Sequence, residues 1–378
     1  MRTLVVSDLH LGAAPRNDVL RHEAMRRPLL QTLSSCERLV LLGDVLELRH
    51  GPAYRALQVA RPVLAELAAA LRPPREVVIV AGNHDHGLLA PWLERRASAP
   101  LARSLELETA VDWREGELLD ALAAALEPAR LRAVYPGVWL RDDVYATHGH
   151  YSDRHSTVPL FERVGAGLVA RVVSEPPGGP MAAEDYEGSL APMYAFIDAV
   201  VRRRPPKLDP GGETFQVRAW RRLSGPDGRF ALRRAALRGG FSATVAGLNR
   251  AGLGPLRADV SGTALRDGGL FGMREVLRRL EIPANHVIFG HTHRAGPLPG
   301  DALDGWQTDS GTALWNSGSW VLERSYLGSE PGPSPYRPGF CALVSATGPP
   351  EIVNLLDEAA AQLGDAGRAA DRVAANPL

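Results

Sequence analysis

The stretch Val77–Gly87, VVIVAGNHDHG, joins a buried strand to a set of polar side chains. Its first residues are apolar and mostly β-branched, which predicts a strand over Val77–Ala81. An asparagine, an aspartate and two histidines follow between Gly82 and Gly87. One such segment could be a turn that ends a strand, so its meaning depends on whether other strands in the chain end in the same way.

Other short apolar runs predict an α/β fold whose strands are buried on both faces. Their apolar character is continuous rather than alternating, so we expect other layers to cover each strand on both sides. Apolar residues at helical spacing predict helices over Val59–Leu71 and Arg114–Leu126. The further predicted strands are Thr3–Ser7, Arg38–Leu42, Asp143–Thr147, His286–Phe289 and Ala313–Trp315.

Metal-binding side chains follow nearly every predicted strand. Ligands collect beyond the carboxyl ends of strands in α/β sheets, so residues far apart in the sequence can meet there. Glycines at the strand tips allow the sharp backbone turns that this requires. The residues are Asp8 and His10, Asp44, Asn83 with His84 and Asp85, His148 with His150, and His291 with His293.

The chemistry of this set indicates a reactive metal centre. It offers oxygen and imidazole donors and no thiolate, which disfavours a structural zinc site and suits Mn, Fe or Zn in an open site. Two carboxylates among otherwise neutral ligands do not neutralise the positive charge of two divalent ions. An anionic phosphoryl group would supply the missing negative charge. The set therefore favours a two-metal phosphoester hydrolase.

The motifs D-x-H, G-D-x-x, G-N-H-D, H-G-H and G-H-x-H, in this order, resemble those of the calcineurin-like metallophosphoesterases. The resemblance covers about residues 1–150 and 284–357. It implies two divalent ions (Mn, Fe or Zn), one held by Asp8, His10 and His293, the other by Asn83, His148 and His291, with Asp44 as the bridge.

The resemblance also implies catalytic roles beside the metals. His84 would be the general acid or transition-state stabiliser, and Asp85 the carboxylate that orients it. The implied reaction is in-line attack on phosphorus by a metal-bridging hydroxide. His86 and His150 lie beside motifs and are candidate substrate-binding residues; the alternative is that they are solvated histidines in loops. Asp153, which follows the fourth motif, is expected at the surface.

The implied architecture is a four-layer α/β/β/α sandwich of two mixed sheets with a largely helical inserted cap. We expect residues 1–153 and 284–357 to form the catalytic domain, 154–283 the cap, and 358–378 a C-terminal tail. From Arg154 to Asn285 the chain has 20 basic and 13 acidic residues, a net charge of +7. Arginines and aromatic residues alternate there, so contact with nucleic acid is possible, although a solvated basic face is the favoured interpretation.

Several substrate classes fit these motifs. The favoured one is a nucleotide or another small phosphate ester, hydrolysed by a phosphatase or phosphodiesterase. A lipid-precursor pyrophosphatase similar to UDP-diacylglucosamine hydrolases is an alternative, but those typically carry arginine at the position of His84. In the family's DNA nucleases the capping domain usually follows the last motif, which argues against a nuclease. A non-catalytic scaffold is least favoured, because every ligand position is filled.

The composition agrees with a soluble enzyme and adds little about its substrate. The formal net charge is zero, so the whole chain shows no bias toward nucleic acid or membranes. Cys36 and Cys341 lack a pairing pattern, and we expect free thiols in a reducing compartment. No signal peptide or membrane span is predicted, which favours a cytoplasmic protein. The oligomeric state is not predicted.

Overall fold

The computed structural model describes residues 1–13, 16–99, 104–157, 176, 178–203, 231–250, 256–259, 262–323, 327 and 334–357. The predicted tail, 358–378, lies outside these residues. So do Arg204, Arg218, Arg221, Arg222, Phe215, Trp220 and Phe230 of the predicted cap, and the side chains of Arg202, Arg203, Arg233, Arg234 and Phe241 are not described. Nothing below depends on them.

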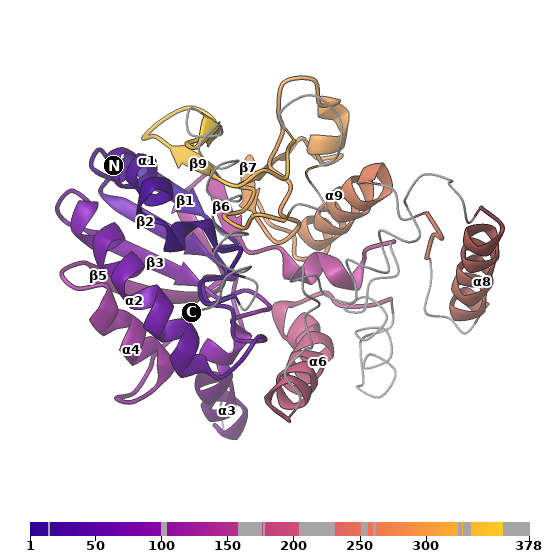
Figure 1. Ribbon diagram of the computed structural model, residues 1–378, viewed down its shortest axis with the longest axis horizontal. Coiled ribbons are helices and arrows are strands. Elements are labelled where there is room, and N and C mark those ends of the chain that lie inside the picture. The colour runs from indigo at the N-terminus through magenta and orange to yellow at the C-terminus, as the bar shows by residue number, and fades with distance from the viewer. Residues whose placement is uncertain are drawn as a thin grey trace, which may run out of the picture.

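A large mixed sheet organises the fold (Figure 1). Its strand order is β10-β9-β1-β2-β3-β5-β6-β7-β8, and β4 pairs with β5. β1, β2, β3 and the first part of β5 run parallel. The strands are β1 Thr3–Val6, β2 Arg38–Leu42, β3 Glu76–Val80, β4 Glu108–Ala110, β5 Arg130–Arg141, β6 Val144–Thr147, β7 His286–Phe289, β8 Ala313–Asn316, β9 Phe340–Val344 and β10 Glu351–Asn354.

Strand β5 changes partner along its length. Its first part pairs in parallel with β3, and from Gly137 onward it pairs antiparallel with β6. Pro136 lies at the change, where a residue without an N–H donor is tolerated. The sequence did not reveal this strand, because RLRAVYPGVWLR mixes arginines and a proline into its apolar pattern.

The two faces of the sheet belong to different hydrophobic clusters. On β1, Leu4 and Val6 belong to one cluster and Val5, between them, to the other. The first cluster includes helix residues, whereas the second contains only strand residues and the segments beside them. The helices on the first face are α1 Glu23–Leu33, α2 Ala53–Ala70 and α4 Leu118–Ala125. The continuous apolar runs are therefore buried on both faces, and the fold is α/β.

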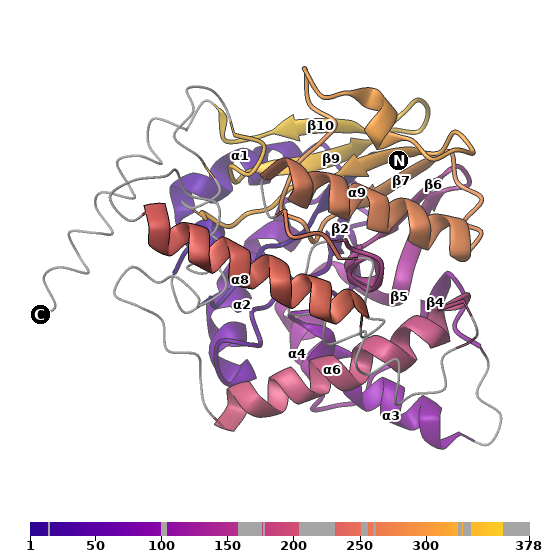
Figure 2. The same ribbon diagram turned by 90° about the vertical axis from the view of Figure 1, so that its right-hand side faces the viewer.

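Long helices from the region between the fourth and fifth motifs lie beyond the strand tips (Figures 1 and 2). They are α6 Ala183–Arg203, α8 Ala231–Arg250 and α9 Gly262–Arg279. α9 packs against the 3-10 helix η3, His150–Arg154, which follows β6, and α6 contacts both η3 and η2, His86–Leu88. The remaining elements are α3 Ala90–Ser98, η1 Val19–Arg21 and η4 Leu303–Trp306.

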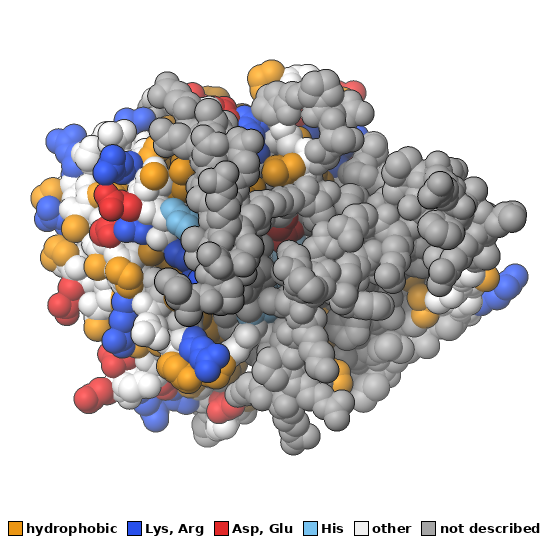
Figure 3. All heavy atoms as spheres, viewed as in Figure 1, with side chains coloured by type: hydrophobic (Ala, Val, Ile, Leu, Met, Phe, Trp, Pro, Cys, Tyr) orange, Lys and Arg blue, Asp and Glu red, His pale blue; other side chains and the backbone are white. Residues whose placement is uncertain are grey.

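The six predicted strands all exist, and the two predicted helices correspond to α2 and α4. The strands β4, β5, β9 and β10 were not predicted. Cys36 and Cys341 are free thiols and buried. Basic and acidic side chains are interspersed over the described surface seen in Figure 3. Among the described residues, no helix is long and apolar enough to cross a membrane.

The stability of the layered core can be tested at Leu41 in β2, which is fully buried in the helix-covered cluster. Leu41→Ala removes packed methyl groups and leaves a cavity, so we expect a loss of about 2–5 kcal/mol in the free energy of unfolding. Leu303→Ala, at a side chain that is 61% exposed, serves as the control and should change it by less than about 0.5 kcal/mol. Urea titration measures both; equal effects would contradict this account of the core.

Candidate metal centre

Asp8, His10 and His293 form the first group of donor atoms, at the tips of β1 and β7. Their ligand atoms lie within 4.8 Å of one another. The Nε2 atoms of His10 and His293 are 3.3 Å apart, and His293 Nε2 lies 3.3 Å from Asp8 Oδ1. Two ring nitrogens and a carboxylate oxygen thus face one point.

The second group consists of Asp44, His148 and His291, again within 4.8 Å. Asn83 adds its amide oxygen, which lies 3.3 Å from His148 Nε2 and 3.1 Å from His291 Nδ1. Asp44 Oδ2 is 3.4 Å from His148 Nε2 and 3.7 Å from His10 Nε2. Asp44 therefore lies between the two groups. The structure brings together all seven residues that the family resemblance assigns to metal binding.

The backbone at these strand tips is unusual. Asp8, His10, Asp44, His291 and His293 all have positive φ, between 44° and 67°. Non-glycine residues rarely adopt this left-handed region, and where they do so they cluster at functional sites. The strain directs short side chains toward one centre.

The glycines of the motifs serve two separate needs. Gly43 has a φ of +83°, and a Cβ there would collide with the ring of His148. Gly290 does not have positive φ, but a Cβ on it would lie 2.5 Å from Asp8 Oδ2. Gly43 therefore supplies both a turn and room for the ring of His148, whereas Gly290 supplies only room beside Asp8.

The donor atoms of these residues suit divalent cations, and an unpaired buried oxygen and two raised pKa values support this. Asp8 Oδ1 is buried and has no hydrogen-bond partner among the described residues. Burial lowers the pKa of His10, but Glu47 and the nearby carboxylates more than offset this and raise it to about 10. Carboxylates likewise raise the pKa of His148 to about 9 against the effect of burial. The site stabilises positive charge, which is what a metal ion would bring.

Glu47 orients His84, and this corrects the role predicted for Asp85. Glu47 Oε2 lies 2.9 Å from His84 Nδ1 and 3.0 Å from His10 Nδ1. Burial lowers the pKa of His84 to about 4, with Glu47 acting in the opposite direction. The sequence contained a signal, because GDVLEL places this carboxylate three residues after Asp44, but the distance in space was not predictable.

Asp85 instead ties two strand tips together. Its carboxylate accepts backbone N–H bonds from Val45 and Gly82 at 2.7 Å, and from Asp44 and Leu46 at 3.3 Å. Burial is the main reason that the pKa of Asp85 is raised, to about 6. Asp85 thus fixes the segment that carries Asp44, and its carboxylate accepts hydrogen bonds from the backbone rather than from His84.

His86 and His150 are not positioned to bind substrate, which corrects a second prediction. Both are buried, and neither lines the pocket described below. His86 Nε2 lies 3.1 Å from Glu187 of α6, and His150 Nε2 lies 3.0 Å from the hydroxyl of Tyr135. Glu187 also accepts bonds from Tyr135 and from Tyr151. These residues form a buried polar cluster that anchors α6 to the strand tips.

Asp153 belongs to the site, although the sequence suggested a surface position. It is 4% exposed, and its Oδ1 lies 2.8 Å from His291 Nε2. Its neighbour Arg154 is partly buried and does not line the pocket. Asp153 is brought inward by η3, a turn of helix that begins at His150, the last residue of the His-Gly-His motif.

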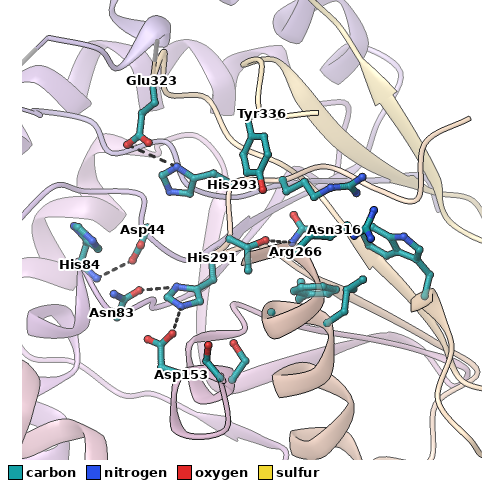
Figure 4. A pocket seen from close by; sticks show the side chains of 18 residues that line it. Asp44, Asn83, His84, Asp153, Arg266, His291, His293, Asn316, Glu323 and Tyr336 are labelled. Atoms are coloured by element: carbon teal, nitrogen blue, oxygen red, sulfur yellow. Dashed lines mark hydrogen bonds and ion pairs between the residues drawn. The ribbon is translucent and has the colours of Figure 1, made fainter. Parts of the chain in front are cut away.

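A cavity of about 230 Å³ opens over the second donor group (Figure 4). Strand-tip residues form one part of its wall, and residues from α9 and from the segments after β7 form the rest. The polar and charged residues that line it are Asp44, Asn83, His84, Ser152, Asp153, Ser156, Arg266, His291, Thr292, His293, Arg294, Asn316 and Glu323.

Residues 1–172 match the family model of the calcineurin-like phosphoesterases. The match covers the first four motifs, and together with the donor groups at the strand tips it identifies the chain as a metal-dependent phosphoric ester hydrolase.

No curated protein matches the chain. Among solved structures, the cold-active protein-tyrosine phosphatase of the psychrophile Shewanella sp. matches with 12% identity and a TM-score of 0.30, over 91% of this chain and 75% of that chain. Another structure of a cold-active protein tyrosine phosphatase matches with 13% identity and a TM-score of 0.27, over 91% and 73%. At such low TM-scores the likeness supports no conclusion about this chain.

The separate roles of Glu47 and Asp85 lead to opposite outcomes for matched amide variants. Glu47→Gln should leave the melting temperature nearly unchanged in metal-loaded protein but lower kcat about 10- to 100-fold, because His84 loses its orienting charge. Asp85→Asn should lower the melting temperature, because its amide group cannot accept all four N–H bonds. Calorimetry and initial rates on p-nitrophenyl phosphate measure the two effects. A stable Asp85→Asn variant with a selective loss of kcat would restore the original assignment.

The cluster around Glu187 gives a pH-dependent stability. Burial raises the pKa of Glu187, but hydrogen bonds from His86, Tyr135 and Tyr151 outweigh it, so the pKa in the folded protein lies below the ordinary glutamate value of 4.5. The charged form therefore stabilises the fold above pH 4.5, and this stabilisation is lost as the pH falls through the folded pKa.

We expect Glu187→Gln to cost about 1–3 kcal/mol of unfolding free energy at pH 7, with the difference from wild type shrinking below pH 4.5. Phe196→Ala, on the same helix at a side chain that is 63% exposed, is the control and should be nearly neutral. Urea titrations at pH 7 and pH 3.5 test this. A difference that stays constant across the two pH values would show that the carboxylate charge is not responsible.

Proposed function

We propose that this chain is a dinuclear-metal phosphatase or phosphodiesterase that acts on a small phosphate ester or nucleotide. The observation that carries the proposal is the position of Asp44, whose Oδ2 lies within 3.7 Å of ring nitrogens from both donor groups. A carboxylate placed in this way can bridge two cations. The groups would hold one ion with Asp8, His10 and His293 and the other with Asn83, His148 and His291.

The ions, once bound, would lower the pKa of a water molecule and neutralise charge on the phosphoryl oxygens. The chain's own residues would position and protonate the ester. A phosphoryl anion beside His84 favours the imidazolium, because an opposite charge raises the pKa of a histidine. The carboxylate of Glu47 would then accept a hydrogen bond from Nδ1–H of His84, while Nε2 gives its proton to the leaving oxygen and the ring becomes neutral.

Asp153 would act through His291. Its carboxylate would accept a hydrogen bond from Nε2–H of that ring. The other ring nitrogen, Nδ1, lies on the side of Asn83 and is then unprotonated and free to bind a metal ion. A carboxylate in this position fixes the tautomer of a ligand histidine and raises its basicity.

The cavity supports a small substrate. A volume of about 230 Å³ is sufficient for a phosphoryl group and a compact leaving group, whereas a lipid precursor or a duplex would need an extended groove. His84 is also at odds with the lipid-precursor alternative, because those pyrophosphatases typically carry arginine there. A nuclease and a non-catalytic scaffold remain less favoured, and Mn, Fe and Zn all suit the donor set.

We further propose that residues 1–153 and 284–357 form the catalytic domain and 154–283 an inserted cap, in a four-layer α/β/β/α arrangement. The strand-only cluster supports the two inner layers. Val5, Val40 and Val78 on one part of the sheet are fully buried without any described helix residue in their cluster, which also holds Val144 and Ile288 from β6 and β7. The two parts of the sheet would therefore cover each other.

The proposal predicts metal-dependent turnover. Chelator-treated enzyme should be inactive on p-nitrophenyl phosphate and bis-p-nitrophenyl phosphate, and Mn, Fe or Zn should restore activity at about two ions per chain. His84→Ala should lower kcat about 10²- to 10⁴-fold while keeping the metal, because it removes the proton donor.

His22→Ala is the matched control, since His22 is exposed and outside the site. It should be as active as the wild type. Initial rates and elemental analysis give both readouts. Absence of turnover with every metal in protein that binds two ions would favour the scaffold, and a strong preference for one ester would choose between phosphatase and phosphodiesterase.

A further inference from the structure

Helix α9 approaches the metal-binding loops unusually closely. A Cβ on Gly272 would lie 2.7 Å from the carbonyl oxygen of Ser152, and a Cβ on Gly269 would lie 3.0 Å from the methyl group of Thr292. Thr292 stands between His291 and His293, and Ser152 belongs to η3. Because these two helix positions carry no side chain, α9 can form a wall of the pocket.

Arg266 lies on the same face of α9 as Gly269. Positions 266, 269, 270 and 273 follow the i, i+3, i+4, i+7 spacing of one helix face. Leu270 and Met273 on that face are buried, at 6% and 1% exposure. Arg266 lines the pocket together with His84 and both histidines of the fifth motif (Figure 4). Arg266 therefore places a positive charge on a helix face whose other residues are small or apolar. A charge in such surroundings requires a polar or anionic partner.

The guanidinium of Arg266 is only partly engaged. Its Nε donates to Asp267 at 2.8 Å, and that carboxylate is itself 57% exposed, so the pair is weak. No partner of its two terminal amino groups is recorded within the part of the chain that the structure describes. Burial raises the pKa of Asp301, but Arg294 and the backbone of Leu298 outweigh it and lower the pKa, with a minor contribution from Arg266. Burial raises the pKa of the Tyr336 phenol, and Arg266 acts against it.

Arg294, the other arginine of the pocket, is already committed. Both of its amino groups bond Asp301, at 3.1 and 2.5 Å, and its guanidinium stacks over Trp306 at 5.3 Å from the ring centroid. Its charge is therefore neutralised within the protein, and it supports the pocket wall. Of these two arginines, Arg266 is the one with donors available to a ligand.

We propose that Arg266 binds a second anionic group on the substrate, a carboxylate or a further phosphate in the leaving group. A guanidinium recognises such oxyanions through two parallel hydrogen bonds. The residues that would bind the metal ions lie at the strand tips, whereas Arg266 lies on α9. Different structural elements would therefore bind the two ends of the substrate. This deepens the proposed function and rests on it: the preferred substrate is a phosphate ester with a negative charge on its leaving group.

Ligand pairs that differ by one carboxylate test the proposal. Phenyl phosphate is compared with 3- and 4-carboxyphenyl phosphate as substrates, and benzylphosphonate with 3- and 4-carboxybenzylphosphonate as non-hydrolysable ligands. Metal-loaded wild type should bind at least one carboxylated phosphonate about 10-fold more tightly than benzylphosphonate, measured by calorimetry, and should show a matching decrease in KM.

Arg266→Ala should abolish that preference, because the affinity gained from the carboxylate is lost with the guanidinium, and the same calorimetry measures it. Arg278→Ala, near the other end of α9 at a side chain that is 63% exposed, should keep the preference. Arg266→Lys should retain part of it, since the charge remains but the paired donors do not.

The outcomes separate the two hypotheses. Equal affinities of wild type for the plain and carboxylated phosphonates, or a preference that survives in Arg266→Ala, overturn the role of Arg266 even if the enzyme is active. A preference that depends on Arg266, seen by calorimetry in protein that hydrolyses none of the phosphates, supports the anion subsite and counts against the proposed function.

Discussion

The four backbone N–H bonds to the buried carboxylate of Asp85 hold the site together. They fasten the turn after β2 to the turn after β3, and so fix where Asp44 and Asn83 stand relative to each other. A carboxylate that satisfies several backbone donors is a stronger constraint than a side-chain pair, because leaving those donors buried and unpaired is costly. Asp44 can reach both donor groups because its backbone is held in this way.

The strand tips concentrate strain and negative charge, which bound cations would offset. Five donor residues have left-handed backbone, at a cost on the order of 1–3 kcal/mol each, and the carboxylates of Asp8 and Asp44 are buried side by side with Glu47. Cations that bind this arrangement will stabilise the fold by mass action. The site is therefore preorganised for metal at the expense of the stability of the metal-free protein.

The helices between the fourth and fifth motifs complement this centre in two ways. Glu187 anchors α6 through a buried cluster of His86, Tyr135 and Tyr151, and glycines on α9 allow that helix to press against the loops of the ligand histidines. Chemistry at the strand tips and recognition on a helical wall can thus change independently. Residues of α9 form part of the pocket wall, whereas α6 packs against η2 and η3 beside it.

The sequence by itself determined the strands that lead to the site and the ligand residues at their tips, because an apolar run, a glycine and a donor residue are adjacent in the chain. Only the tertiary structure decided what those side chains face. Glu47, for which no role was predicted, lies where Asp85 was expected, beside His84, since the direction of a side chain after a turn depends on backbone dihedrals. His86 and His150 turn away from the pocket toward Glu187 and Tyr135, and Asp153 turns into it, because helices distant in sequence supply their partners. Strand β5 was not predicted, because its pairing changes from β3 to β6 at Pro136. A local sequence pattern does not show which strand is the neighbour.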